Sequence, residues 1–93
     1  MSMKLWLIYQ HENNRYDTYD SAVVAAETEA DAQRTNPGEY ACAAEGGLWA
    51  FSFYPEPRQD DAWANWDKVK VQLLGDALEG TPPRVICASY NAG

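Results

Sequence analysis

The chain has 93 residues, the length of one small domain that folds around its own core. Aromatic residues make up 13% of it, which argues against a disordered chain, because disordered chains are poor in aromatic side chains. The formal net charge of -7 argues against direct binding to nucleic acid or to an anionic membrane, because both require a positively charged surface. Two explanations of the charge remain open: it keeps a small domain soluble, or its acids face a basic partner.

Residues 4–10 form a short apolar run, rich in aromatic and branched side chains, that is typical of a central strand. The run is too short for a signal peptide, and no stretch has the length of a membrane helix, so we expect a cytoplasmic protein. The polar residues 11–15 suit a hairpin turn, and residues 19–27 predict a second strand.

A helix is predicted directly after the second strand. Thr28 is the candidate N-cap, with Glu29 and Asp31 in the first turn, where the helix dipole favours negative charge. Asn36 and Pro37 end the helix, because the residue before a proline avoids helical geometry. Small alanine side chains in the preceding strand allow such a helix to pack closely against the sheet.

Four further segments complete the predicted fold. Residues 48–54 alternate partly and predict an edge strand or a hairpin arm, and residues 60–66 predict one helical turn with two tryptophans on one side. Residues 67–75 are the clearest strand, with one buried and one wet face, and residues 84–90 predict an internal strand. The chain is therefore predicted to be a single α+β domain: a small antiparallel sheet of four to five strands, one main helix on a face and a short second helical turn.

The sequence shows no arrangement typical of catalysis or metal binding. His11 is the only histidine and lies in a polar turn, without a second histidine or a neighbouring cysteine. Cys42 and Cys87 are far apart and lack CxxC spacing, which predicts reduced thiols, with Cys87 in the core. Paired carboxylates lie in polar stretches, where both members stay ionised. We therefore expect no enzymatic activity, no cofactor and no metal.

Negative charge is concentrated in residues 16–67, where eleven acids stand against only Arg34 and Arg58. Phosphates of one DNA strand are about 3.4 Å apart, and same-face residues of a β-strand recur at about 6.6 Å. Carboxylates on a strand edge, a helix start and a following loop can therefore approximate a row of phosphates. The alternative is a solvated face with ordinary helix capping. The candidate phosphate mimics are Asp17, Asp20, Glu27, Glu29, Asp31, Asp60, Asp61 and Asp67.

Aromatic residues lie next to these acids in the sequence. The candidates are Tyr16, Tyr19, Trp63 and Trp66. Aromatic side chains interleaved with charge are common in interface hot spots, so these residues are candidate contacts to a partner protein. The alternative, which the short chain favours, is that the two tryptophans are buried in the core.

Several stretches of the chain resemble a family of small phage and prophage proteins. They are MKLWLIYQ at 3–10, YDTYDSAVVAAETEADA at 16–32, the dipeptide NP at 36–37, WDKVKVQLLGDA at 66–77 and VICASYNAG at 85–93. Members of that family share a start similar to KLWLI, a turn similar to YDTYDS-VVAAE and an ending similar to ASFNAG. Residues 38–65 depart from this pattern, which favours an insertion at 38–65 within the single domain 1–93.

The resemblance implies an origin in a phage or mobile element, where small acidic proteins of this size are often anti-CRISPR proteins. It implies an anti-CRISPR protein that binds the basic nucleic-acid-binding surface of a type I effector complex (Cascade) and blocks target DNA as a DNA mimic. Such a protein would act as a monomer in the cytoplasm of a bacterial host. The alternative is a phage accessory protein that binds a host protein through an aromatic surface, without catalysis.

Overall fold

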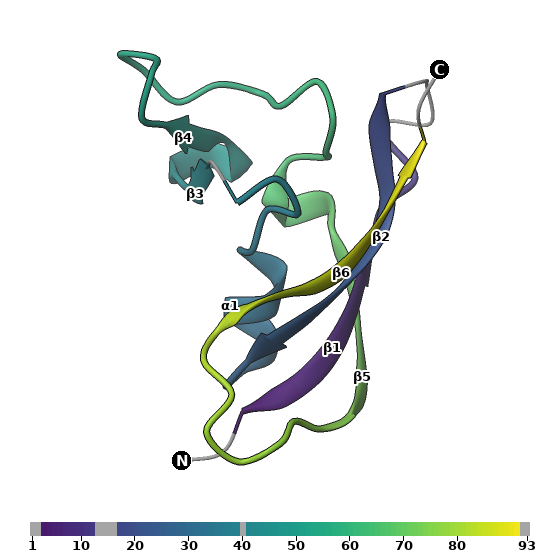
Figure 1. The fold of residues 1–93 in the computed structure, drawn as a ribbon. Coiled ribbons are helices and arrows are strands. Elements are labelled where there is room, and N and C mark those ends of the chain that lie inside the picture. Colours follow the sequence, from purple (N-terminus) through teal and green to yellow (C-terminus); the bar gives the residue numbers. More distant parts are fainter. Residues whose placement is uncertain (1–2, 13–16, 40, 92–93) are drawn as a thin grey trace.

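The computed structural model describes residues 3–12, 17–39 and 41–91 (Figure 1). In chain order, its strands (β), α-helix (α) and 3-10 helices (η) are β1 (Lys4–Tyr9), β2 (Thr18–Ala26), α1 (Glu29–Gln33), β3 (Ala41–Ala43), η1 (Glu45–Gly47), β4 (Trp49–Phe51), η2 (Trp66–Lys68), β5 (Lys70–Asp76) and β6 (Arg84–Asn91). They form a four-stranded antiparallel sheet, a two-stranded sheet of β3 and β4, and short helical pieces. None of the described helices is long and apolar enough to cross a membrane.

The main sheet has the strand order β5-β1-β2-β6, with β1 and β2 in the middle. Across the β1–β2 pair, Trp6 lies opposite Val24 and Ile8 lies opposite Ala22. Opposed residues share a face of the sheet, and all four of these side chains are buried. The indole Nε1 of Trp6 donates to the carbonyl of Ala26 at 3.0 Å. The predicted antiparallel sheet is confirmed, with four of the four to five strands expected, and so is the central place of the first strand.

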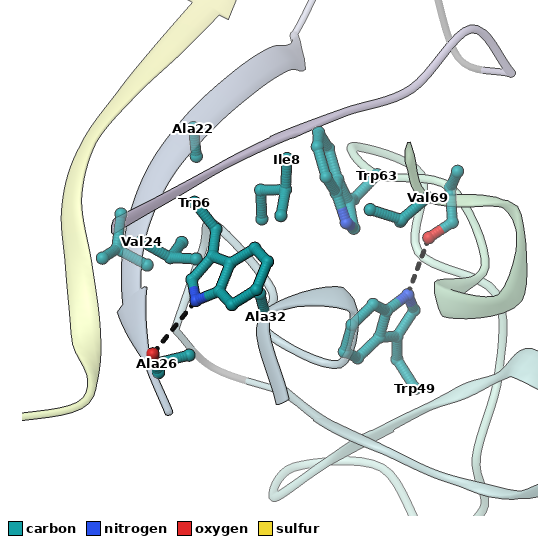
Figure 2. Packing of buried hydrophobic residues seen from close by; sticks show 11 residues of the cluster. Trp6, Ile8, Ala22, Val24, Ala26, Ala32, Trp49, Trp63 and Val69 are labelled. Carbon is teal, nitrogen blue, oxygen red and sulfur yellow. Dashed lines mark hydrogen bonds between the residues drawn. The ribbon is translucent and has the colours of Figure 1, made fainter. Parts of the chain in front are cut away.

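The core lies between this face of the sheet and the chain that follows α1 (Figure 2). Trp49 of β4 and Trp63 of the segment after it are both 0% exposed. The indole Nε1 of Trp49 donates to the carbonyl of Ala64 at 2.9 Å, which satisfies a polar group inside an apolar cluster. Residues 38–65, expected to be an insertion, therefore supply two of the largest side chains of the core.

The helix α1 has only five residues, so helix is a minor part of this fold and not the main helix that we expected. Its start agrees with the prediction, because Oγ1 of Thr28 accepts the hydrogen bond from the backbone N–H of Asp31 at 3.1 Å. Ala32 is buried against the core. Beyond the last turn, the side-chain oxygen of Asn36 accepts the N–H of Gly38 at 2.8 Å, and this polar turn takes the place of further helix.

The last strand corrects one expectation. β6 pairs with β2 and lies at the edge of the sheet, not inside it (Figure 1). Val85 is buried, whereas Ile86 and Cys87 are exposed, so Cys87 is not the core residue that its apolar neighbours suggested. An apolar, β-branched composition suits a central and an edge strand alike, and for this reason it did not reveal the place of β6.

Residues 60–66 correct a second expectation, because they do not form a helical turn and η2 begins only at Trp66. The side chain of Asp60 gives the reason. Its Oδ1 accepts the backbone N–H of Ala62 at 2.9 Å, and its Oδ2 accepts Nδ2 of Asn36 at 2.9 Å. A carboxylate that binds the backbone two residues ahead forms an Asx turn, which competes with helix formation.

Candidate binding surface

Four carboxylates line one open hollow, which we call the acidic hollow. Its volume is about 510 Å³, and the acids that line it are Glu12, Asp17, Asp60 and Asp61. Lys68 is the basic side chain among the described residues that line it. The hollow therefore carries an excess of negative charge. Of its four acids, the sequence predicted all but Glu12 as partner-binding residues.

A backbone hydrogen bond joins two of the chain segments that line the acidic hollow. The backbone N–H of Tyr19 donates to the carbonyl of Ala62 at 2.9 Å, which ties the start of β2 to the segment that carries Asp60. Asp17 precedes β2 with a φ of 62°, a left-handed conformation that aspartate tolerates better than most residues. Asp17 and Asp61 are exposed, and Asp60 is partly buried. The segment that follows Asp17 and the segment that follows Asp60 and Asp61 are thus joined directly through their backbones.

Three of the predicted acids lie at the far end of β2. Glu27 follows that strand, and Glu29 and Asp31 occupy the first turn of α1. Since extended chain rises about 3.3 Å per residue, Glu27 lies about 30 Å from Asp17. The helix dipole favours negative charge in the first turn, which by itself explains why acids occupy positions 29 and 31. No contact with a partner is needed to explain Glu29 and Asp31.

The two remaining acids are also separate from the acidic hollow. Asp20 is exposed within β2 at a β-bulge, and Asp67 is exposed in η2. The eight predicted acids therefore do not form a single row. The structure brings Asp17, Asp60 and Asp61 together in one hollow and distributes the others over different elements.

The predicted aromatic contacts are mostly covered by other parts of the chain. Trp63 is fully buried, as the core alternative held, and in this conformation it does not reach the surface. Trp66 is partly buried, and its Nε1 donates to a backbone carbonyl at 2.7 Å. Tyr19 is partly buried and meets Tyr90 edge to face, with ring centroids 4.9 Å apart. Tyr16 lies outside the described residues.

An exposed aromatic cluster that the sequence analysis missed lies on residues 51–58, which we call the aromatic loop. It begins at Phe51, the last residue of β4, and runs far from the main sheet (Figure 1). The ring centroids of Phe51, Phe53 and Tyr54 are 5.0 to 5.8 Å apart. Phe53 is 65% exposed and Tyr54 is 44% exposed. The available signal in the sequence is an aromatic run that Pro55 and Pro57 end, but its partial alternation predicts a strand.

The aromatic loop borders a second hollow of about 560 Å³, which we call the aromatic hollow. Its lining includes the three rings of the loop, and it also includes Arg58, Asp60 and Asp61. Asp60 and Asp61 line the acidic hollow as well. The two hollows therefore share a wall that carries two carboxylates, with acids on one side of it and aromatic rings on the other.

Among the described residues, the phenol of Tyr90 is the titratable group whose pKa is shifted. Desolvation beside the Tyr19 ring raises the pKa of Tyr90, and the carboxylate of Asp17 adds to the rise through its charge and a hydrogen bond. Desolvation of the phenol is the larger cause, and the nearby negative charge adds to it, because both disfavour the phenolate. Tyr90 is therefore neutral at physiological pH and serves Asp17 as a hydrogen-bond donor.

Among the described residues there is no group of three or more His, Cys, Asp or Glu side chains that could hold a metal ion. Comparison with known proteins adds no assignment: no family model matches the chain, and neither a curated protein nor a solved structure matches it. The structural features that bear on function are therefore the two hollows and the charge of the chain.

Proposed function

We propose that this chain is an anti-CRISPR protein that binds the basic DNA-binding surface of a type I effector complex and blocks target DNA. It acts without catalysis, in the cytoplasm of the bacterial host. The observation that carries the proposal is the convergence of Glu12, Asp17, Asp60 and Asp61 on one open hollow. The resemblance to phage proteins supports the choice of partner.

Electrostatics explains why such a hollow favours a basic partner. Charges of one sign that line a cleft focus the electric field and raise the local concentration of an oppositely charged partner. Asp17 and Asp61 are exposed, so a partner's Lys or Arg side chains can reach them. Binding replaces repulsion among the acids by attraction to the partner. Close charge pairs across an interface contribute about 1.5 to 7 kcal/mol each in coupling energy.

The acidic variant for the test changes two residues, Asp17→Asn and Asp61→Asn. Asn tolerates the left-handed backbone at position 17, and both residues are exposed, so the substitutions remove charge with little effect on folding. Asp60 is left in place because it holds Asn36 and Ala62. The matched control, Glu45→Gln with Glu79→Gln, removes the same charge from two exposed residues that do not line the acidic hollow.

The measurement is a plaque assay with a phage that a type I CRISPR system targets, in a host that expresses each protein. We expect the wild type and the control to restore plaques, and the Asp17 and Asp61 variant to restore at least about tenfold fewer. The reason is that each lost charge pair costs about 1.5 kcal/mol or more, which is about a tenfold loss of affinity. Equal rescue by all three proteins would retain the anti-CRISPR function and reject the acidic mechanism. No rescue by the wild type in several subtypes would reject the function itself.

A second candidate function follows from the aromatic loop. A phage accessory protein that binds a host protein through aromatic side chains needs exposed rings, and Phe53 and Tyr54 are the exposed rings of this loop. Binding of that kind responds weakly to salt, because apolar burial dominates it. A binding constant that hardly changes with ionic strength would therefore favour this second function over the first.

A further inference from the structure

We propose that the aromatic hollow is a binding site for the side chain of an arginine on a basic partner protein. The hollow has a volume of about 560 Å³, within the range of about 300 to 1,000 Å³ that is usual for ligand sites. Three aromatic rings line it from the loop, and Asp60 and Asp61 line it from the wall that it shares with the acidic hollow. Aromatic faces and carboxylates together are the groups that bind an organic cation.

A cation–π contact already present in the aromatic loop supports the chemistry. The guanidinium carbon of Arg58 lies 4.0 Å from the centroid of the Tyr54 ring, well inside the distance of about 6 Å at which such contacts are attractive. Arg58 covers one ring, while Phe53 keeps 65% of its surface exposed. A second guanidinium can therefore stack on the phenylalanine rings of the same hollow.

The charges that line the aromatic hollow favour a cation. Its two carboxylates outnumber the one guanidinium of Arg58, so the described lining is net negative. Asp61 is exposed and makes no hydrogen bond or ion pair with the described part of the chain, which leaves its carboxylate available to a partner. Arginine fits better than lysine, because its planar guanidinium stacks on a ring and binds a carboxylate at the same time.

Backbone hydrogen bonds join the end of the aromatic loop to β4, where the loop begins. Few additional groups therefore become ordered when a partner binds. The backbones of Trp49 and Arg58 exchange two hydrogen bonds, each of 2.9 Å, which form an isolated β-bridge. Within the loop, the N–H of Tyr54 donates to the carbonyl of Phe51 at 3.2 Å. A loop that is held in its binding conformation loses little conformational entropy when the partner arrives. An exposed cluster of rings on such a loop is typical of an interface.

This inference rests on the proposed function, since a basic partner supplies the arginine, but it can be tested without that partner. The probe is the peptide acetyl-Gly-Arg-Gly-amide, and the control probe replaces arginine by citrulline, which has the same shape without the charge. Backbone amide shifts of the 15N-labelled protein are followed during each titration. We expect saturable shifts in the aromatic loop and at Asp60 and Asp61 with the arginine peptide, and binding at least about threefold weaker with the citrulline peptide.

Variants of exposed residues make the test specific. Phe53→Ala is expected to weaken binding of the arginine peptide by about three- to tenfold, the range of a typical cation–π contact. Asp61→Asn is expected to weaken it as well, whereas Glu56→Gln, which removes the same charge from an exposed acid that does not line the hollow, leaves it unchanged. The amide spectrum of each variant in the absence of peptide verifies its fold.

Three results would overturn the proposal: no saturable shifts at residues 51–62, equal affinity for the arginine and citrulline peptides, or equal weakening by Asp61→Asn and Glu56→Gln. The plaque assay separates this inference from the proposed function. Peptide binding without rescue of phage would keep the arginine site and reject the CRISPR partner. Rescue that Phe53→Ala leaves intact, together with no peptide binding, would keep the function and reject the arginine site.

Discussion

At the scale of single residues, the two fully buried tryptophans outside the main sheet differ in one hydrogen bond. Nε1 of Trp49 donates to the carbonyl of Ala64 at 2.9 Å, whereas Nε1 of Trp63 has no hydrogen-bond partner among the described residues. Both indoles are 0% exposed, so their apolar burial is alike. A buried donor without a partner costs about 1 to 3 kcal/mol, because it loses its bond to water and gains none in return.

We therefore predict that Trp49→Phe destabilises the fold more than Trp63→Phe. Each change leaves a similar void, but the first leaves the carbonyl of Ala64 unpaired, whereas the second removes an unpaired donor. The free energy of unfolding, measured with urea, is expected to fall by about 1 to 3 kcal/mol more for Trp49→Phe. Equal losses would show that Trp63 has an acceptor in solution, for example a buried water.

The candidate site also shows which of its residues can be predicted from the sequence alone. Asp17, Asp60 and Asp61 were identified from charge density alone, and they do share a hollow. Glu12 was not identified, because its place beside them depends on how the segments around residues 12, 17 and 60 meet in space. The exposure of Phe53 was missed for a related reason: an aromatic residue in a short chain is expected in the core, and only tertiary structure places its loop outside.

At the scale of elements, local signals predicted the parts that depend on local chemistry. The strand of residues 4–10 and the N-cap at Thr28 follow from periodicity and capping, and the structure contains both. Of the hairpin arm predicted for residues 48–54 from alternation, the structure forms only β4, Trp49–Phe51, which pairs with β3. Position within the sheet was predicted less well. β6 was expected to be internal, but strand order depends on long-range pairing that periodicity does not encode.

The contact between η1 and η2 gives a prediction at this scale. Gly46 and Gly47 both have left-handed φ values, 71° and 81°. A Cβ at position 46 would meet nothing within 4 Å, whereas a Cβ at position 47 would lie 2.5 Å from Oδ1 of Asp67. Gly46→Ala is therefore expected to lower the free energy of unfolding by about 1 to 2 kcal/mol, the backbone cost alone. Gly47→Ala is expected to lower it further, because η2 must shift or Asp67 must change rotamer.

A double-mutant cycle checks this assignment by urea unfolding. In the background of Asp67→Ala, the steric part disappears, so Gly47→Ala and Gly46→Ala are expected to cost the same. If Gly47→Ala still costs more in that background, the contact with Asp67 is not its cause. If the two glycine variants already cost the same in the wild type, the carboxylate of Asp67 moves aside freely.

At the scale of the whole molecule, the chain places a net charge of -7 in a small volume. The described residues extend over 35 × 28 × 20 Å. An ion pair between two described residues joins Lys4 and Asp76 at 3.2 Å, and their side chains are 40% and 78% exposed, so it offsets little of the repulsion. The free energy of the folded state therefore includes a repulsive term from the excess of acidic over basic side chains.

Salt is expected to stabilise this protein. The Debye length is about 30 Å at 0.01 M ionic strength and about 8 Å at 0.15 M, so at low salt the acids repel one another across the entire molecule and at physiological salt only near neighbours do. Unfolding moves the charges apart, which means that screening favours the folded state.

We predict that Tm rises with sodium chloride over this range, and that the rise is smaller in a variant with Glu45→Gln, Glu56→Gln and Glu79→Gln, whose net charge is smaller in magnitude. A Tm that falls as salt is added would mean that attractive pairs outweigh repulsion, and an equal rise in both proteins would assign the effect to something other than charge. The same screening weakens binding to a basic partner, so the salt concentration that stabilises the fold most is expected to be one at which the proposed inhibition is weakest.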